Sequence, residues 1–116
     1  MNNEIGLFAT QNKLSIPILN RLVKKMNLGL DFRGIKVCDG LIIDGHHRYI
    51  ASLLTGYNLE IFPSNKSSIT GIIDWKLIEL LDNDFDSLEK IQEHNKNDAL
   101  RNDIKIENLI DLLNNS

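Results

Sequence analysis

The residues with the greatest chemical potential form one run, Asp44-Gly45-His46-His47-Arg48, directly after the apolar segment Leu41-Ile42-Ile43. The apolar segment predicts a strand, and the pattern after Gly45 predicts that a helix begins there. A helix N-terminus has unpaired backbone N–H groups and a partial positive charge, so it attracts anions. Two histidines and an arginine at this point therefore predict a turn that binds phosphate.

Each residue of this run is of a type that is suited to binding or transferring phosphate. Gly45 has no β-carbon, so the backbone can approach a bulky anion closely. Arg48 has a planar guanidinium that can pair with two phosphate oxygens at once. His47 can donate a hydrogen bond to developing negative charge or shuttle a proton near neutral pH, and His46 is a second candidate for proton transfer. Asp44 can cap the helix or hold a divalent cation beside the phosphates.

Each of these residues also has an ordinary structural interpretation. Asp44 can be only an N-cap, one of the histidines can be a packed, hydrogen-bonded ring, and Arg48 can form a surface ion pair. We favour the functional interpretation, because surface helices rarely begin with such a cluster. Adjacent histidines on a helix point about 100° apart, whereas a two-histidine zinc site needs residues three or four positions apart, so no zinc site is predicted.

The composition is that of an ordinary globular protein. A length of 116 residues suits one domain with a single core. The net charge of -3 argues against a broad basic surface for nucleic acid, although a local basic patch is compatible with it. The sequence has no apolar stretch long enough to span a bilayer and no signal peptide at its N-terminus. We therefore expect a cytoplasmic protein without a membrane partner, and the sequence leaves its oligomeric state open.

The elements around the run predict one α+β domain over residues 1–116. Helical spacing of apolar residues, the tight-turn dipeptide Asp39-Gly40 and alternating segments give the order of the first half. That order is a helix from Ser15 or Pro17 to Asn27, a hairpin of residues 35–38 and 41–43, a helix from Gly45 to Gly56, and a strand at 59–62 that stops at Pro63.

The second half is expected to be extended at first and then helical. Residues 71–81 carry strand signals and a competing signal for a helical turn around Trp75, and we expect extended structure there. A weaker strand is predicted at 5–8. The sequence Asp86-Ser87-Leu88-Glu89 is typical of a capping box and predicts a helix to about Lys96, with a final helix at 107–113. We expect a small mixed sheet flanked by helices, with residues 86–116 as a C-terminal helical extension packed on it.

Residues 15–63 resemble a domain that ParB-type partition proteins, sulfiredoxins and free-serine kinases share. The matching pieces are a proline-bearing segment before a helix, a glycine before the hairpin, the glycine turn with basic residues, a later glycine and a closing strand. They are Ile16-Pro17, Gly34-Ile35-Lys36-Val37, the segment from Ile42 to Ala51, Gly56, and residues 59–62. The resemblance covers about two fifths of the chain and implies the compact ParB/sulfiredoxin-like fold.

The resemblance implies that the turn binds nucleotide phosphates, as it does for ATP in sulfiredoxin, CTP in ParB and the phosphoryl donor of the kinase. Gly45, His47 and Arg48 match the glycine, histidine and arginine of the sulfiredoxin and kinase turns. His46 stands where sulfiredoxin has its reactive cysteine, so repair of sulfinic acids is not expected. The remaining residues do not accommodate the DNA-binding domain of ParB, so chromosome partition is not expected either.

Five other polar residues are candidates for the phosphate site, namely Lys13, Arg21, Lys66, Ser67 and Ser68. Lys13 precedes the segment that lies beside the turn in the relatives, and Lys66 and Ser67 follow the closing strand, where they can reach its rim. For each of them, a solvated surface residue is the competing interpretation. The C-terminal part also resembles, more weakly, ParB-like domains at the ends of bacterial polymorphic toxins, which implies a delivered effector domain as an alternative.

Three functions follow from these observations. The first is a nucleotide-binding domain that hydrolyses a nucleoside triphosphate, ATP or CTP, or transfers its phosphate with the help of Mg²⁺ near Asp44. In this function His47 stabilises charge and Arg48 clamps the phosphates. The second is a nuclease in which His46 or His47 is the general base toward DNA or RNA. The third is a nucleotide-binding or interaction module without catalysis.

Overall fold

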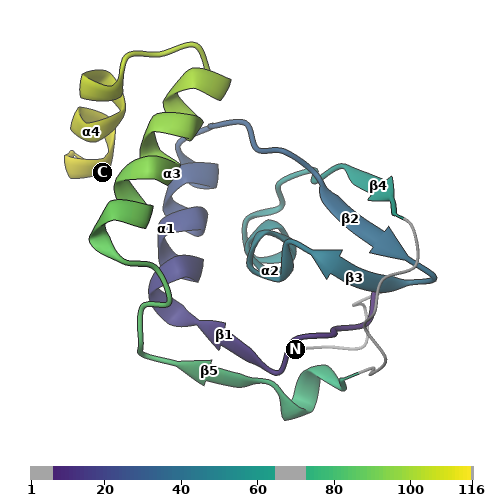
Figure 1. Cartoon of the computed structure of the whole chain (residues 1–116). Helices are drawn as coiled ribbons and strands as arrows, with labels where there is room; N and C mark the ends of the chain where they lie inside the picture. Colours follow the sequence, from purple (N-terminus) through teal and green to yellow (C-terminus); the bar gives the residue numbers. More distant parts are fainter. Residues whose placement is uncertain (1–6, 65–72, 116) are drawn as a thin grey trace.

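The computed structural model describes residues 7–64 and 73–115, and Figure 1 shows their arrangement. The described elements combine helices and strands, so the predicted α+β class is confirmed. No helix in these two ranges is both long and apolar enough to cross a bilayer. The elements are β1 (Lys13–Ser15), α1 (Ile16–Asn27), β2 (Ile35–Cys38), β3 (Leu41–Asp44), α2 (His46–Thr55), β4 (Ile61–Pro63), the 3-10 helix η1 (Trp75–Leu77), β5 (Glu79–Leu81), α3 (Leu88–Arg101) and α4 (Ile106–Asn114).

The strands form two small sheets. The first has the order β3-β2-β4, in which β2 is antiparallel to β3 and parallel to β4. The second pairs β1 with β5 in parallel, with Leu14 opposite Leu80. Helix α2 connects β3 to β4, so the turn at Gly45 lies where the chain leaves the three-stranded sheet. The mixed sheet was predicted, whereas the β1–β5 pair was not.

Turn and cap residues determine where the first elements begin and end. The hairpin closes at Asp39 and Gly40, whose φ angles of 51° and 78° are those of a two-residue hairpin turn. The hydroxyl of Ser15 accepts a hydrogen bond at 3.4 Å from the first turn of α1. Helix α2 ends at Gly56, which has a φ of 77° and donates its N–H to the Ser52 carbonyl at 2.9 Å. The predicted hairpin and helix ends are thus confirmed.

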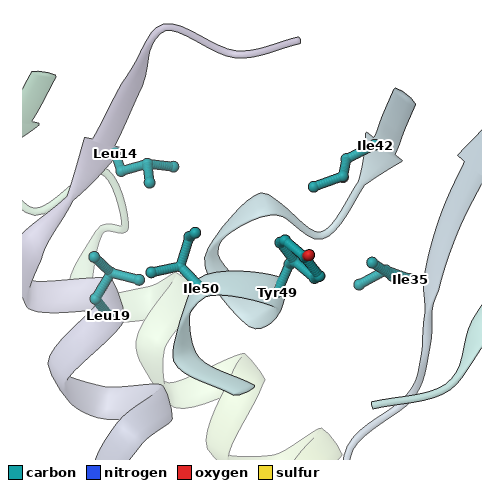
Figure 2. Close-up of a cluster of buried hydrophobic side chains, with 6 residues drawn as sticks. All are labelled: Leu14, Leu19, Ile35, Ile42, Tyr49 and Ile50. Atoms are coloured by element: carbon teal, nitrogen blue, oxygen red, sulfur yellow. The ribbon is translucent and has the colours of Figure 1, made fainter. Parts of the chain in front are cut away.

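Helix α2 lies at the centre of the core. Its residues Tyr49 and Ile50 pack among buried side chains from β1, α1, β2 and β3, which Figure 2 shows: Leu14, Leu19, Ile35 and Ile42. Its residue Ala51 belongs to a second buried cluster with residues of α1, α3 and α4, namely Met26, Ala99 and Leu109. Since α2 packs in both clusters, its N-terminus is fixed relative to the three-stranded sheet and to the C-terminal helices.

Ion pairs attach the C-terminal helices to α1, which lies beside α3 (Figure 1). The Lys25 ammonium of α1 lies 2.6 Å from the Asp98 carboxylate of α3, and the Lys25 side chain is only 5% exposed. Ahead of α3, the Arg21 guanidinium donates two hydrogen bonds to Asp84, at 2.6 and 2.9 Å. These pairs hold α3 and the segment before it against α1.

Replacing Asp98 with alanine is expected to lower the free energy of unfolding by about 2 kcal/mol, because the Lys25 ammonium stays buried without its partner. Water reaches part of the Asp98 side chain, which keeps the loss below that of a fully buried pair. Urea denaturation measures the effect. The double variant Lys25→Met/Asp98→Leu removes both charges and is expected to recover most of the loss. A double variant as unstable as the single one would contradict this account.

The start and end of α3 differ from the prediction. The helix begins at Leu88, because the Ser87 hydroxyl, and not Asp86, caps it by accepting the Lys90 N–H at 3.2 Å. It continues past Lys96 to Arg101. The sequence after Lys96 is mostly polar, so it gave no apolar periodicity to extend the predicted helix.

Three extended segments also differ from the prediction. Strand β4 begins at Ile61 and includes Pro63, which is tolerated because β4 is an edge strand. In residues 71–81 the described extended structure includes β5, whereas Trp75–Leu77 forms a turn of 3-10 helix, which is the alternative that the sequence offered around Trp75. Of the strand expected at 5–8, residues 5 and 6 lie outside the described part, and Phe8 forms an isolated bridge.

Candidate functional site

The turn between β3 and α2 leaves the helix N-terminus without a side-chain cap. Gly45 is the N-cap residue, with a left-handed φ of 98°, and the first helical hydrogen bond joins the Tyr49 N–H to the Gly45 carbonyl at 2.9 Å. The three preceding N–H groups, of His46, His47 and Arg48, therefore have no partner within the helix. No side chain in the described ranges caps them. These donors are available to an anion.

The expectation that Asp44 caps this helix is wrong. Asp44 is one residue too early, since the chain turns at Gly45, and its side chain is about half exposed. Its carboxylate oxygen Oδ2 lies 3.5 Å from the Arg48 guanidinium, which is a weak contact. The carboxylate thus lies at the turn and is accessible from solvent.

Gly45 is packed too closely to have a side chain. A β-carbon at this position would lie 2.3 Å from Cγ2 of Ile35 and 2.9 Å from Nη2 of Arg48. The turn is therefore pressed against β2 on one side and covered by the guanidinium on the other. This close packing places the Arg48 guanidinium against the turn.

The His46 ring is a buried hydrogen-bond acceptor. Its Nε2 accepts the Thr10 backbone N–H at 3.0 Å and lies 3.2 Å from the Thr10 hydroxyl, which donates to the Ile42 carbonyl at 2.6 Å. The residue is 5% exposed, and burial lowers its pKa to about 4. The ring is therefore neutral, with its proton on Nδ1. The lone pair that a general base needs is occupied, so this geometry favours the structural interpretation of His46.

His46 is expected to make the fold sensitive to mild acid. Its folded pKa of about 4 lies below the usual value of 6.5, so the unfolded chain binds the extra proton first and stability falls as the pH drops from 6.5 to 4. We expect a loss of about 2 to 3 kcal/mol from this residue. Denaturation at pH 7 and pH 4 measures it. In His46→Gln, whose amide oxygen can also accept the Thr10 N–H, this part of the loss is expected to vanish; an unchanged pH dependence would contradict the assignment.

His47 also accepts a hydrogen bond from the backbone. Its Nε2 lies 2.9 Å from the Ser15 N–H, and its ring meets that of Phe85 edge to face at 6.0 Å. Burial lowers the pKa of His47, and the charge of Asp86 partly opposes this shift. The neutral ring retains Nδ1–H as a donor. His47 can thus stabilise negative charge, but it has no free lone pair to accept a proton.

Arg48 is a largely buried guanidinium with unused donors. Its side chain is 15% exposed, and Nη2 makes two long contacts, to the Gly34 carbonyl at 3.4 Å and to Asp44 at 3.5 Å. Within the described part of the chain, its buried Nε has no hydrogen-bond partner. Burial lowers the pKa of Arg48, and repulsion from Arg33 lowers it further. A bound anion would give the Nε–H an acceptor and would offset both the burial of the Arg48 charge and its repulsion from Arg33.

The turn forms one wall of a cleft of about 640 Å³, and residues of α1, α3 and the segment before β2 form the others. Arg33 and Arg101 line it together with Arg48, and the charges of both lower the pKa of Arg48. The lining is completed by an apolar part and by polar residues of several elements. These residues are Gln11, Ile18, Arg21, Leu22, Phe32, Asp44, Gly45, His46, His47, Asp86, Lys90, Glu93, His94, Asn97 and Asp98.

Of the outlying candidates, Arg21 lines this cleft, whereas Lys13 is exposed on β1 and is not among the lining residues. Lys66, Ser67 and Ser68 lie outside the described residues. Arg33 and Arg101 also line the cleft, and neither was predicted from the sequence. The sequence did contain a signal for the α3 side of the cleft: the polar residues 90, 94, 97 and 101 have helical spacing, which places them on one face of the helix.

A divalent cation would have few protein ligands here. No group of three or more histidine, cysteine or acidic side chains with metal-site geometry is present among residues 7–64 and 73–115. Asp44 alone offers a half-exposed carboxylate at the turn. This fits Mg²⁺, which proteins often bind through one or two carboxylates while substrate phosphates and water supply the remaining ligands.

Comparison of the chain with protein-family models, with curated proteins and with solved structures gives no match. Function is therefore inferred from the residues and the geometry of the cleft.

Proposed function

We propose that this chain binds a nucleoside triphosphate in the cleft, with its phosphates on the Gly45–Arg48 turn, and hydrolyses it or transfers its terminal phosphate. The observation that carries the proposal is the unsatisfied state of Arg48. A buried guanidinium with an unpartnered Nε, next to uncapped helix N–H groups, is costly unless an anion binds there. Polyphosphate supplies the missing acceptors.

The arrangement of positive charge supports a polyphosphate and not a single small anion. Arg33, Arg48 and Arg101 line one cleft, and the charges of Arg33 and Arg101 both oppose that of Arg48. Carboxylates also line the cleft, but two of them, Asp86 and Asp98, contact Arg21 and Lys25. Several like charges gathered at one cleft are typical of a binding site for a multiply charged ligand. Arg101 does contact Asp31 at 3.4 Å, but both side chains are substantially exposed, so this pair is weak.

The remaining surface of the cleft suits a nucleoside. Its volume of about 640 Å³ lies within the range of small-molecule sites. Ile18, Leu22 and Phe32 give it an apolar part, against which a base can pack.

The resemblance to the ParB/sulfiredoxin domain supports the same proposal. The hairpin of β2 and β3, the glycine turn, α2 and β4 follow one another in the order that the resemblance implies. Gly45, His47 and Arg48 have matching positions in the motif. We propose this family for the chain on the strength of that order and motif.

Mg²⁺ would be held by Asp44 together with phosphate oxygens. When bound, it would neutralise part of the phosphate charge. In this arrangement Arg48 orients the phosphates, and His47 donates its Nδ1–H toward the charge that develops on the transferred group.

Equilibrium binding of ATP, CTP and GTP, each with and without Mg²⁺, tests the proposal. We expect at least one of them to bind, inorganic triphosphate to compete, and added salt to weaken binding. The control variant Lys24→Ala removes an exposed cation outside the cleft and is expected to bind like the parent. Turnover is then measured as the release of phosphate and of the nucleoside diphosphate.

The other outcomes of this experiment distinguish the proposed function from the nuclease and from the non-catalytic module. The proposal is contradicted if neither a nucleoside triphosphate nor inorganic triphosphate binds. Cleavage of DNA or RNA without nucleotide binding would favour the nuclease. Binding without turnover would leave only the non-catalytic module.

A further inference from the structure

We propose that His94 is the general base of the reaction, oriented by Asp86, and that it deprotonates the group that attacks the terminal phosphate. This inference rests on the proposed function. Both residues line the cleft, but they come from α3 and the segment before it, far in the sequence from the glycine turn. The pair places a proton acceptor on the wall that faces the phosphate-binding residues.

The contact between the two side chains leaves one ring nitrogen for chemistry. His94 Nε2 lies 3.6 Å from Asp86 Oδ2. This distance is longer than a hydrogen bond, as is common for catalytic pairs before substrate binds. The contact leaves Nδ1 to accept a proton. The His94 side chain is 51% exposed and the Asp86 side chain 18%, so the carboxylate is the more buried member of the pair and the ring is the one open to solvent.

Asp86 is held close to the phosphate-binding turn. Its Oδ2 lies 3.4 Å from Arg21 Nη2, and its N–H donates to Asp84 at 3.0 Å. The neighbouring Phe85 packs its ring against that of His47. The buried Ser15 hydroxyl donates to the Asn83 carbonyl at 2.8 Å, and the N–H of Ser15 donates to His47. A continuous set of contacts therefore connects the carboxylate to the turn.

The other two histidines do not compete for this role. His46 and His47 each use Nε2 to accept a backbone N–H, from Thr10 and from Ser15. A neutral ring with its Nε2 lone pair occupied has only an N–H left, so it can donate but not accept. Of the histidines, His94 alone combines a carboxylate partner with a ring nitrogen that the contact leaves for proton transfer.

The reaction balances with this assignment. The oxygen of water or of an acceptor hydroxyl forms a bond to the terminal phosphorus as its proton moves to His94 Nδ1. The bond between that phosphorus and the bridging oxygen breaks, and the nucleoside diphosphate departs with the electron pair. His94 is then an imidazolium whose Nε2–H faces the Asp86 carboxylate, and it returns the proton to solvent.

Variants of His94 with chemical rescue test the proposal. In His94→Ala, turnover of the triphosphate that binds best is expected to fall by about 10²-fold or more, while its dissociation constant changes by less than about threefold. Added imidazole is expected to restore part of the turnover, which it would not do for a structural defect. Asp86→Asn is expected to lower turnover by about tenfold or more and to leave binding intact.

The matched control is Glu89→Gln, on the exposed side of α3 and outside the cleft lining, which is expected to behave like the parent. Parent-like turnover in His94→Ala, or a loss that imidazole does not rescue, would overturn the role of His94. A parent protein that binds nucleotide without turning it over would also overturn it, and would leave the proposed binding intact. Absence of binding in the parent would overturn both.

Discussion

Replacing Gly45 with alanine is expected to destabilise the protein by about 4 kcal/mol, a large fraction of the stability of a domain of this size. Two costs add. An alanine at a φ of 98° adopts a conformation that L residues avoid, at about 1 to 2 kcal/mol. Its β-carbon would also lie 2.3 Å from Cγ2 of Ile35, a fully buried side chain that cannot move freely, and such overpacking costs about 1 to 3 kcal/mol.

Gly56→Ala and Gly29→Ala separate the two costs. Both glycines have similar positive φ angles, of 77° and 87°, but a β-carbon at either position would meet nothing within 4 Å. Each control is expected to lose only about 1 to 2 kcal/mol. Urea denaturation of the three variants measures the difference. If Gly45→Ala is no less stable than the controls, the turn is not pressed against β2 as described.

The sequence predicted the turn because its signals are local. An apolar strand, a glycine and a basic helix start follow one another within a few residues, and Asp39-Gly40 indicated the hairpin in the same way. The opposite wall of the cleft was not predictable by that means. Arg33 and Arg101 are far apart in the sequence, and only the packing of α3 beside α1 brings them to Arg48.

The roles of the histidines were hidden from the sequence for a different reason. The backbone N–H groups of Thr10 and Ser15 occupy the Nε2 lone pairs of His46 and His47, and no pattern of side chains in the sequence reveals such backbone contacts. His46 and His47 thereby connect the segment of Thr10 and β1 to the start of α2. The proposed role of His94 depends on its contact with Asp86 at the cleft, and no motif in the sequence indicates that contact.

Arg48→Met is expected to weaken nucleoside triphosphate binding by about 10²- to 10³-fold, equivalent to about 3 to 4 kcal/mol. The Arg48 side chain is 15% exposed, against 28% for Arg21 and 44% for Arg101 in the same cleft, and its Nε is free to donate to phosphate. Arg48→Lys is expected to bind with intermediate affinity, because an ammonium cannot form two parallel hydrogen bonds. Calorimetric titration with the best-binding triphosphate measures all three proteins, and Lys24→Met is the matched control.

The stability of the same variants distinguishes a binding residue from a structural one. Arg48 gains little from its long contacts to Gly34 and Asp44, while burial and repulsion from Arg33 oppose its charge. Arg48→Met is therefore expected to unfold at the same urea concentration as the parent, or at a higher one. Such a combination, with affinity lost and stability kept, is typical of groups arranged for a ligand at the expense of the fold. A variant that loses stability but still binds nucleotide would show that Arg48 serves the fold and that the anion site lies elsewhere.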